Sequence, residues 1–269
     1  MAPRISFFVF ALALLLGIAS ASDVPGAIKF GYSDNNGPDK WGNLDPTFSP
    51  CSSGKTQSPI NILKNLTVHN KLLKPLTRNY KPANATLVNN GFNVGLHFEE
   101  YAGEVSIDGK NYELRQMHWH VPSEHLIDGE QFAAELHLVH SAADHSIAVV
   151  AILYQQNDTD PFVAKIMNGL NELAKEKCKA DEIAEIPIGT LDIKQLKRSS
   201  RKYYRYVGSL TTPPCSGNVT WNILGKVRSI SKEQIAALEI PVNSDCKKNA
   251  RPCQPLNGRK IEVYDELIG

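Results

Sequence analysis

Hydrophobic and polar residues alternate over short runs along most of the chain, a period typical of strands that bury one face. Runs of this kind cover residues 85–89, 92–98, 104–107, 112–120, 133–140, 147–154 and 219–224. Asp108-Gly109 and Asp128-Gly129 lie between neighbouring runs, and Asp-Gly pairs favour the tight turns of antiparallel hairpins. We therefore predict a mainly β fold of the α+β class, a single domain with a central, mostly antiparallel twisted β-sheet and short peripheral helices.

Two segments carry sequence signals of a helix N-terminus. Asp160 stands as an N-cap before Pro161, which predicts a helix over Pro161–Lys177. A second helix is predicted over Ser231–Leu238, because its first residue and Gln234 have the spacing of a capping box. The segment Gly31–Cys51 is rich in Gly, Pro, Asn and Asp, which predicts an irregular arm lying over the core.

The first 21 residues have the three parts of a secretory signal peptide. A short basic start, Met1 to Arg4, precedes the apolar run Ile5 to Ile18, and Ala19-Ser20-Ala21 has the small residues of a cleavage site. The apolar run is shorter than the ~20 residues that a spanning helix needs. We predict a signal peptide over residues 1–21 and one domain over residues 22–269, with no membrane attachment after cleavage.

Composition supports the secretory route and excludes one class of partner. Lys and Arg total 29 and Asp and Glu total 28, so a net charge of +1 supplies no general attraction for nucleic acid or anionic membranes. Four N-x-[ST] sequons are candidate glycosylation sites: Asn65, Asn84, Asn157 and Asn218. Because an apolar strand is predicted directly after Asn218, we expect that residue to be too buried for glycosylation.

The chain has five cysteines, and an odd number cannot all pair within one chain. An oxidising compartment favours at least one disulfide. None of them forms a C-x-x-C pair, so a cysteine-based zinc site is not expected. The five are Cys51, Cys178, Cys215, Cys246 and Cys253.

Two neighbouring strand runs carry polar side chains in a pattern typical of a metal site. His118 and His120 share one face of the first run, with Gln116 two residues earlier on the same face, and Glu135 and His137 share a face of the next run. An isolated His-x-His is more often two polar side chains facing solvent. If the two runs pair, however, three imidazoles converge beside an amide and a carboxylate. Catalytic zinc takes three protein ligands and one water, with outer hydrogen bonds fixing the imidazole tautomers.

The other histidines lack this spacing. His140 follows His137 by three residues and so faces the opposite side of its strand, which predicts a hydrogen-bonded core histidine. His125 lies in the link between the two runs, where we expect a structural hydrogen bond. The remaining three are interpreted as surface or second-layer residues: His69, His97 and His145.

The residues around these histidines resemble a known family. The run from Gln116 to His120, together with the run from Ser123 to Val139, is similar end to end to the signature of the alpha-class carbonic anhydrases. Further matches cover nearly the whole chain after the leader: Phe30–Tyr32, Gln57–Asn61, Asn89–Gly91, Tyr206–Pro214, Val219–Trp221 and Asn249–Pro252. The short Val121-Pro122-Ser123 link is similar to secreted plant members.

The resemblance implies a zinc lyase that reversibly hydrates carbon dioxide to bicarbonate and a proton through a zinc-bound hydroxide. It makes His118, His120 and His137 the Zn2+ ligands, backed by Gln116 and Glu135. It makes Thr211 the acceptor of a hydrogen bond from the hydroxide and a donor to Glu124. The matching substrate pocket consists of Val139, Val149, Leu210, Thr212 and Trp221, and the polar side of the cleft of Tyr32, Asn90 and Asn93. Cys51 and Cys215 match positions that are disulfide-bonded in secreted members.

One position departs from the family pattern. Many members have a histidine after Asn-Asn-Gly, where this chain has Phe92. A phenylalanine cannot relay protons, so we expect a weakened proton shuttle that relies on water chains, buffer or another histidine. His97 is the nearest alternative, but its spacing gives no reason to place it in the cleft.

The resemblance leaves other functions open. One alternative is a storage or binding protein that keeps the fold with low activity, as in similar plant tuber proteins, and another is an ascorbate-recycling reductase, for which no nucleotide-binding glycine motif exists. The intact candidate ligands favour the enzyme. We expect a small-molecule substrate, carbon dioxide or bicarbonate, no nucleic-acid partner, and a monomer or weak dimer. The predicted location is the secretory pathway, leading to the extracellular space or apoplast, with a plastid reached by the secretory route as the alternative.

Overall fold

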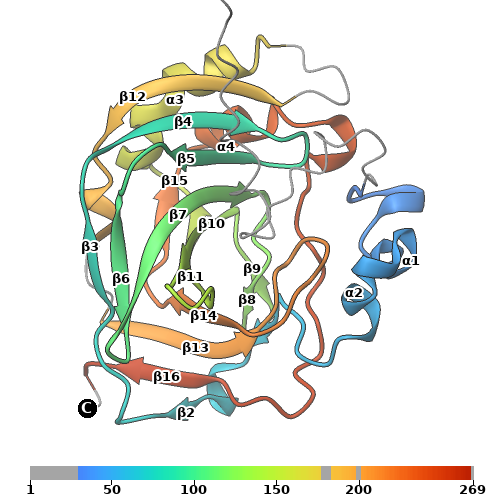
Figure 1. Ribbon diagram of the computed structural model, residues 1–269, viewed down its shortest axis with the longest axis vertical. Helices are drawn as coiled ribbons and strands as arrows, with labels where there is room; N and C mark the ends of the chain where they lie inside the picture. Colours follow the sequence, from blue (N-terminus) through green and yellow to red (C-terminus); the bar gives the residue numbers. More distant parts are fainter. Residues whose placement is uncertain (1–29, 177–182, 198–200, 268–269) are drawn as a thin grey trace, which may run out of the picture.

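A large curved sheet forms the body of the protein (Figure 1). The computed structural model describes residues 30–176, 183–197 and 201–267. The predicted signal peptide and Cys178 therefore lie outside the described residues. No helix in the described part of the chain has the length and apolar character needed to cross a membrane.

The helices within the described residues are short and few. They are α1 (Trp41–Leu44), α2 (Pro50–Ser53), α3 (Pro161–Leu173) and α4 (Lys232–Glu239), with 3₁₀ turns at residues 34–36, 46–48, 64–66, 194–197 and 244–246. The strands are β1 (Asn61–Ile62), β2 (Val68–His69), β3 (Thr77–Tyr80), β4 (Ala83–Asn89), β5 (Val94–Phe98), β6 (Gly103–Ile107), β7 (Lys110–His120), β8 (Leu126–Ile127), β9 (Glu130–Gln131), β10 (Ala134–Ser141), β11 (Ile147–Gln156), β12 (Ala184–Leu191), β13 (Lys202–Gly208), β14 (Val219–Leu224), β15 (Arg228–Ile230) and β16 (Glu262–Asp265).

In the described part of the chain the main sheet has 13 strands, and its long path runs in the order β12-β4-β5-β7-β10-β11-β14-β13-β16-β2. Strand β6 joins β7 and β3, and β15 joins β11. Most pairs are antiparallel, while β11 pairs in parallel with β14 and β15, and β16 pairs in parallel with β2. A second sheet holds only β1, β8 and β9. The predicted class, a mainly β fold with a mostly antiparallel sheet and peripheral helices, is confirmed.

Local sequence signals account for the turns and the helix starts. Asp108 and Gly109 both have positive φ, 52° and 81°, and join β6 to β7, as a two-residue Asp-Gly hairpin turn requires. Asp160 accepts hydrogen bonds from the N–H groups of Phe162 and Val163, so the predicted N-cap of α3 is confirmed. The predicted capping box of α4 is present as well. The predicted end of the first helix is wrong, because α3 stops at Leu173 and the chain tightens into a turn through the Lys175 N–H to Glu172 C=O bond.

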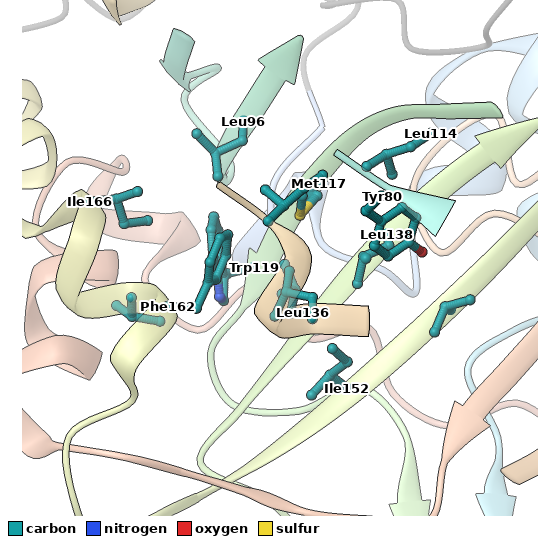
Figure 2. Packing of buried hydrophobic residues seen from close by; sticks show 14 of the residues in the cluster. Tyr80, Leu96, Leu114, Met117, Trp119, Leu136, Leu138, Ile152, Phe162 and Ile166 are labelled. Carbon is teal, nitrogen blue, oxygen red and sulfur yellow. The ribbon is translucent and has the colours of Figure 1, made fainter. Parts of the chain in front are cut away.

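One hydrophobic cluster includes the packing of α3 against the sheet. Trp119 of β7 stacks on Phe162 of α3 with ring centroids 6.2 Å apart, and Leu96, Met117 and Ile166 lie around this pair (Figure 2). Because strand side chains alternate, the burial of Met117 and Trp119 on this side turns the intervening residues of β7 to the opposite face. That face carries the histidines.

The arm over the core contains short helical turns rather than wholly irregular chain. Trp41 of α1 is fully buried and its indole N–H donates to the carbonyls of Gly31 and Asn36. A disulfide joins Cys51 to Cys215 across 164 residues, with the Cα atoms 5.0 Å apart. The arm is therefore tied covalently to the loop that follows β13.

The four sequon asparagines all lie on the surface. Asn65, Asn84 and Asn157 are exposed, as is Asn218, so the expectation that Asn218 is buried is wrong. Asn218 has a φ of 60° and sits in the turn before β14, and burial begins only at Val219.

Candidate metal centre

The site forms where β7 and β10 pair in antiparallel register. His118 lies opposite His137, and His120 lies opposite Glu135. The candidate ligand nitrogens of His118, His120 and His137 all lie within 4.8 Å of one another. The structure thus brings together the three histidines that the alternation of the two strands predicted.

Each imidazole has one nitrogen held by a partner outside the cluster. His118 Nδ1 donates to Gln116 Oε1 at 2.9 Å, and His120 Nδ1 donates to the backbone oxygen of Asn249 at 2.7 Å. His137 Nε2 donates to Glu135 Oε1 at 2.7 Å. A neutral imidazole carries one N–H, so these bonds leave an unprotonated nitrogen on each ring: Nε2 of His118, Nε2 of His120 and Nδ1 of His137.

These three nitrogens suit a zinc ion. Nε2 of His118 and Nδ1 of His137 lie 3.2 Å apart with no proton to share, and Nε2 of His120 is buried without a hydrogen-bond partner among the described residues. Two zinc–nitrogen bonds of about 2.0–2.1 Å at a tetrahedral angle place the nitrogens about 3.3 Å apart. Lone pairs that would repel each other become ligands if a cation lies between them.

Burial keeps the imidazoles in the form that binds metal. Burial lowers the pKa of His118 well below its usual value and that of His120 to about 4. It also lowers the pKa of His137, although the neighbouring Glu135 carboxylate acts in the other direction. All three rings are therefore neutral near pH 7, as metal ligation requires.

Glu135 is the buried anchor behind the cluster. Its Oε1 accepts from His137 Nε2 and His125 Nδ1, both at 2.7 Å, and its Oε2 accepts from the backbone N–H groups of Glu124 and His125 at 2.9 and 2.8 Å. Burial alone would raise the pKa of Glu135, but the two imidazoles hold it well below its usual value. The hydrogen-bond network continues from His125 to Tyr206, whose hydroxyl donates to His125 Nε2 at 2.8 Å. The expected structural role of His125 is confirmed.

His140 lies on the other side of β10, as predicted. It is fully buried, and its ring bonds to the Tyr80 hydroxyl at 2.8 Å and the Ala148 carbonyl at 3.2 Å.

Glu124 is a second buried carboxylate beside the cluster. Its Oε1 accepts the backbone N–H of Arg251 at 2.9 Å, and its Oε2 lies 3.4 Å from His120 Nε2. Burial raises the pKa of Glu124 to about 7, against the lowering effects of His137 and of a hydrogen bond from the Thr211 side chain. Thr211 is buried and lines the cleft in front of this carboxylate.

The cleft in front of the cluster encloses about 780 Å³ including its open mouth. Its apolar wall is a row across three neighbouring strands, because Val139 of β10 pairs with Val149 of β11, which pairs with Trp221 of β14. The predicted pocket residues Leu210 and Thr212 line it as well, and so do Asn90 and Asn93. Tyr32 lies outside this lining, against Trp41, with ring centroids 5.4 Å apart.

Two further residues line the cleft near its mouth. Phe92, the residue after Asn-Asn-Gly, packs its ring on that of Phe30, with the ring centroids 4.8 Å apart. His97 also lines the cleft, and its side chain is exposed, so it is a surface residue as interpreted, but one that faces the cleft. The spacing along β5 did not indicate this, because the facing of His97 depends on how β5 pairs with β7.

Sequence reasoning missed the role of Asn249. Besides accepting the His120 bond through its carbonyl, it receives the Val121 N–H on its side-chain oxygen at 2.8 Å and donates to the Phe92 carbonyl at 2.8 Å. It joins three segments around the imidazole of His120. The only signal was its place in a motif near the end of the chain.

Comparison with known proteins agrees with this geometry. The model of the eukaryotic-type carbonic anhydrase family matches residues 36–265. The chain is 41% identical to alpha carbonic anhydrase 7 of Arabidopsis thaliana over 97% of this chain and 96% of that protein. The crystal structure of dioscorin complexed with ascorbate is similar with a TM-score of 0.85, at 37% identity over 90% of this chain and all of that one. The complex of the Thermovibrio ammonificans alpha-carbonic anhydrase with the inhibitor sulfanilamide has a TM-score of 0.78, at 33% identity over 88% of this chain and all of that one.

Proposed function

Because this chain belongs to the eukaryotic-type carbonic anhydrase family, we propose that it is a zinc enzyme that reversibly hydrates carbon dioxide to bicarbonate and a proton. One observation carries the proposal. Unprotonated nitrogens of His118, His120 and His137 converge beside a cleft, and each ring is locked by a hydrogen bond on its other nitrogen.

The three imidazoles would hold Zn2+ beside the cleft, and three protein ligands are the number that catalytic zinc sites take. A bound zinc ion lowers the pKa of a coordinated water to about 7 and so supplies a nucleophile near neutral pH. Thr211 and Glu124 orient the attacking oxygen in this proposal. In the zinc-loaded enzyme we expect the Thr211 hydroxyl, which lowers the pKa of Glu124, to donate to that carboxylate and to keep its oxygen free to accept a hydrogen bond from the cleft.

The walls of the cleft suit the substrate and the product differently. Carbon dioxide is apolar and uncharged, and the row of Val139, Val149 and Trp221 offers it a surface without competing hydrogen bonds. Bicarbonate and water are polar, and Asn90 and Asn93 line another part of the cleft. Asn90 Nδ2 donates to Asn93 Oδ1 at 2.9 Å, which holds both amides in place.

Phe92 has no group that accepts a proton, so we propose that the proton shuttle is weaker than in members with a histidine at that position. Hydration itself depends on the metal-facing imidazoles, Thr211 and the apolar wall, none of which Phe92 supplies.

We also propose the secretory route for this chain. The Cys51–Cys215 disulfide is of a kind that persists in oxidising compartments, and the four exposed sequon asparagines are accessible to glycosylation. The predicted leader over residues 1–21 would direct the chain there.

A binding or storage protein of low activity is the competing function, and the similarity to a dioscorin crystallised with ascorbate motivates it. The hydrogen bonds behind the three imidazoles count against it. Loss of metal chemistry would release the constraint on the side chains of Gln116 and Glu135, yet each still bonds to its ring.

Stopped-flow hydration of carbon dioxide by the purified zinc-loaded chain tests the proposal, with His137→Ala as the metal-site variant and His145→Asn as the matched control at an exposed histidine. We expect hydration by the wild type and the control, and its loss in His137→Ala. A zinc-loaded wild type without hydration activity above background would refute the proposal.

A further inference from the structure

Each turnover of the proposed reaction releases a proton that must leave the cleft before the next one. Phe92 cannot accept it. Among the described histidines that line the cleft, His118 and His137 each have one nitrogen donating to an outer partner and the other directed at the metal position. His97 lines the cleft as well and has no part in the metal cluster.

Strand register places His97 in a defined row. His97 of β5 pairs with Gln116 of β7, which pairs with Val139 of β10, and that residue begins the apolar wall. Residues that lie directly opposite each other share a face of the sheet. His97 therefore faces the same side as the metal-facing imidazoles and stands across Gln116 from the apolar wall.

The neighbouring row brings His97 close to the metal position without direct ligation. Gly95 pairs with His118, so His97 and His118 are diagonal neighbours, a relation that places the residues about 7–8 Å apart and their Cβ atoms somewhat closer. Gly95 has no side chain on the face that it shares with His97, so nothing from residue 95 fills the space between the two imidazoles. One or two hydrogen-bonded waters span a gap of this size.

His97 also meets bulk solvent. Its side chain is exposed, whereas His120 is fully buried and His137 nearly so. Surrounding protein still lowers the pKa of His97, and the Glu185 carboxylate of β12 acts against that. The ring is thus neutral near pH 7 and has a nitrogen available to accept a proton.

We propose that His97 is the proton-transfer residue of this chain: it takes the proton released in the cleft through intervening water and passes it to bulk solvent or buffer. This inference rests on the proposed hydration activity. The step is a proton transfer only. A proton moves from water in the cleft to an imidazole nitrogen and then to an external base, and the imidazole returns to its neutral form.

The test is stopped-flow hydration of carbon dioxide by zinc-loaded His97→Ala in weak, non-imidazole buffer. We expect kcat to fall at least about tenfold, since positioned acid–base groups contribute about 10²–10⁴-fold, while kcat/KM stays within about twofold of wild type. Added imidazole should restore kcat. The control His145→Asn removes an exposed histidine whose φ of 64° asparagine tolerates, and it should change neither constant.

The outcomes separate the two proposals. If His97→Ala keeps wild-type kcat in weak buffer while the wild type is active, the role of His97 is refuted and the proposed function stands. If kcat and kcat/KM fall equally and imidazole restores neither, His97 shapes the site and does not transfer protons, which also refutes the inference. A wild type that does not hydrate carbon dioxide refutes both proposals, because a proton relay presupposes turnover.

Discussion

Replacing Glu135 by glutamine tests the claim that this carboxylate holds the metal site together. The carboxylate accepts four hydrogen bonds, two from imidazoles on Oε1 and two from backbone N–H groups on Oε2. Glutamine has the same shape, but its NH₂ group cannot accept. Whichever way the amide of Glu135→Gln turns, two buried donors lose their acceptor.

The expected loss of stability follows from these two unpaired donors. A buried donor left without a partner costs about 1–3 kcal/mol, so two cost about 2–6 kcal/mol of the unfolding free energy. Loss of an outer hydrogen bond to a metal-ligating histidine lowers metal affinity by about 10- to 100-fold, which is about 1.4–2.7 kcal/mol.

Two measurements check this prediction. Urea unfolding of metal-free protein reads the stability, and zinc titration against a competing chelator reads the affinity. Glu130→Gln, an exposed glutamate on β9, is the matched control and should behave as wild type. If Glu135→Gln unfolds within about 0.5 kcal/mol of wild type and binds zinc within twofold, the network does not support the site as argued.

Three more expectations concern the arm, the cleft and a helix end. Serine at both Cys51 and Cys215 should lower the unfolding free energy by up to about 5 kcal/mol for a loop of 164 residues, and an unchanged urea midpoint would contradict the stabilising role of the bond. Phe92→His in the His97→Ala background should raise kcat in weak buffer with little change in kcat/KM, and stopped-flow rates that do not respond would show that position 92 cannot relay protons here. Ser231→Ala removes the N-cap of α4 and should cost about 1 kcal/mol, again by urea unfolding, and a loss below about 0.3 kcal/mol would mean that α4 does not depend on its cap.

Local patterns were sufficient to predict that three histidines converge on one face of the sheet. Alternation along a strand decides that His118 and His120 share a face, and a link of fewer than 20 residues leaves an antiparallel neighbour as the simplest partner for the next strand. The Asp-Gly turn and the capping box could be predicted as well, because each depends on residues that are close in the chain.

Contacts between segments that are distant in the sequence could not be predicted from local patterns. The facing of His97 depends on the pairing of β5 with β7, and the β6 hairpin intervenes between those strands in sequence. Asn249 reaches His120 across 129 residues, a contact that no periodicity indicates. The exposure of Asn218 was missed because it depends on the backbone conformation of one turn residue.

Stepwise addition of zinc to metal-free protein, with carbon dioxide hydration measured at each step, tests directly whether the three histidines hold a catalytic zinc ion. The convergence of three unprotonated imidazole nitrogens predicts that activity rises in proportion to added zinc and reaches a plateau at about one ion per chain. His118→Ala, treated in the same way, should gain no activity. A wild-type chain that binds one zinc ion tightly and remains inactive at the plateau, or one whose hydration rate does not depend on zinc, would contradict the assignment of His118, His120 and His137 to a catalytic zinc site.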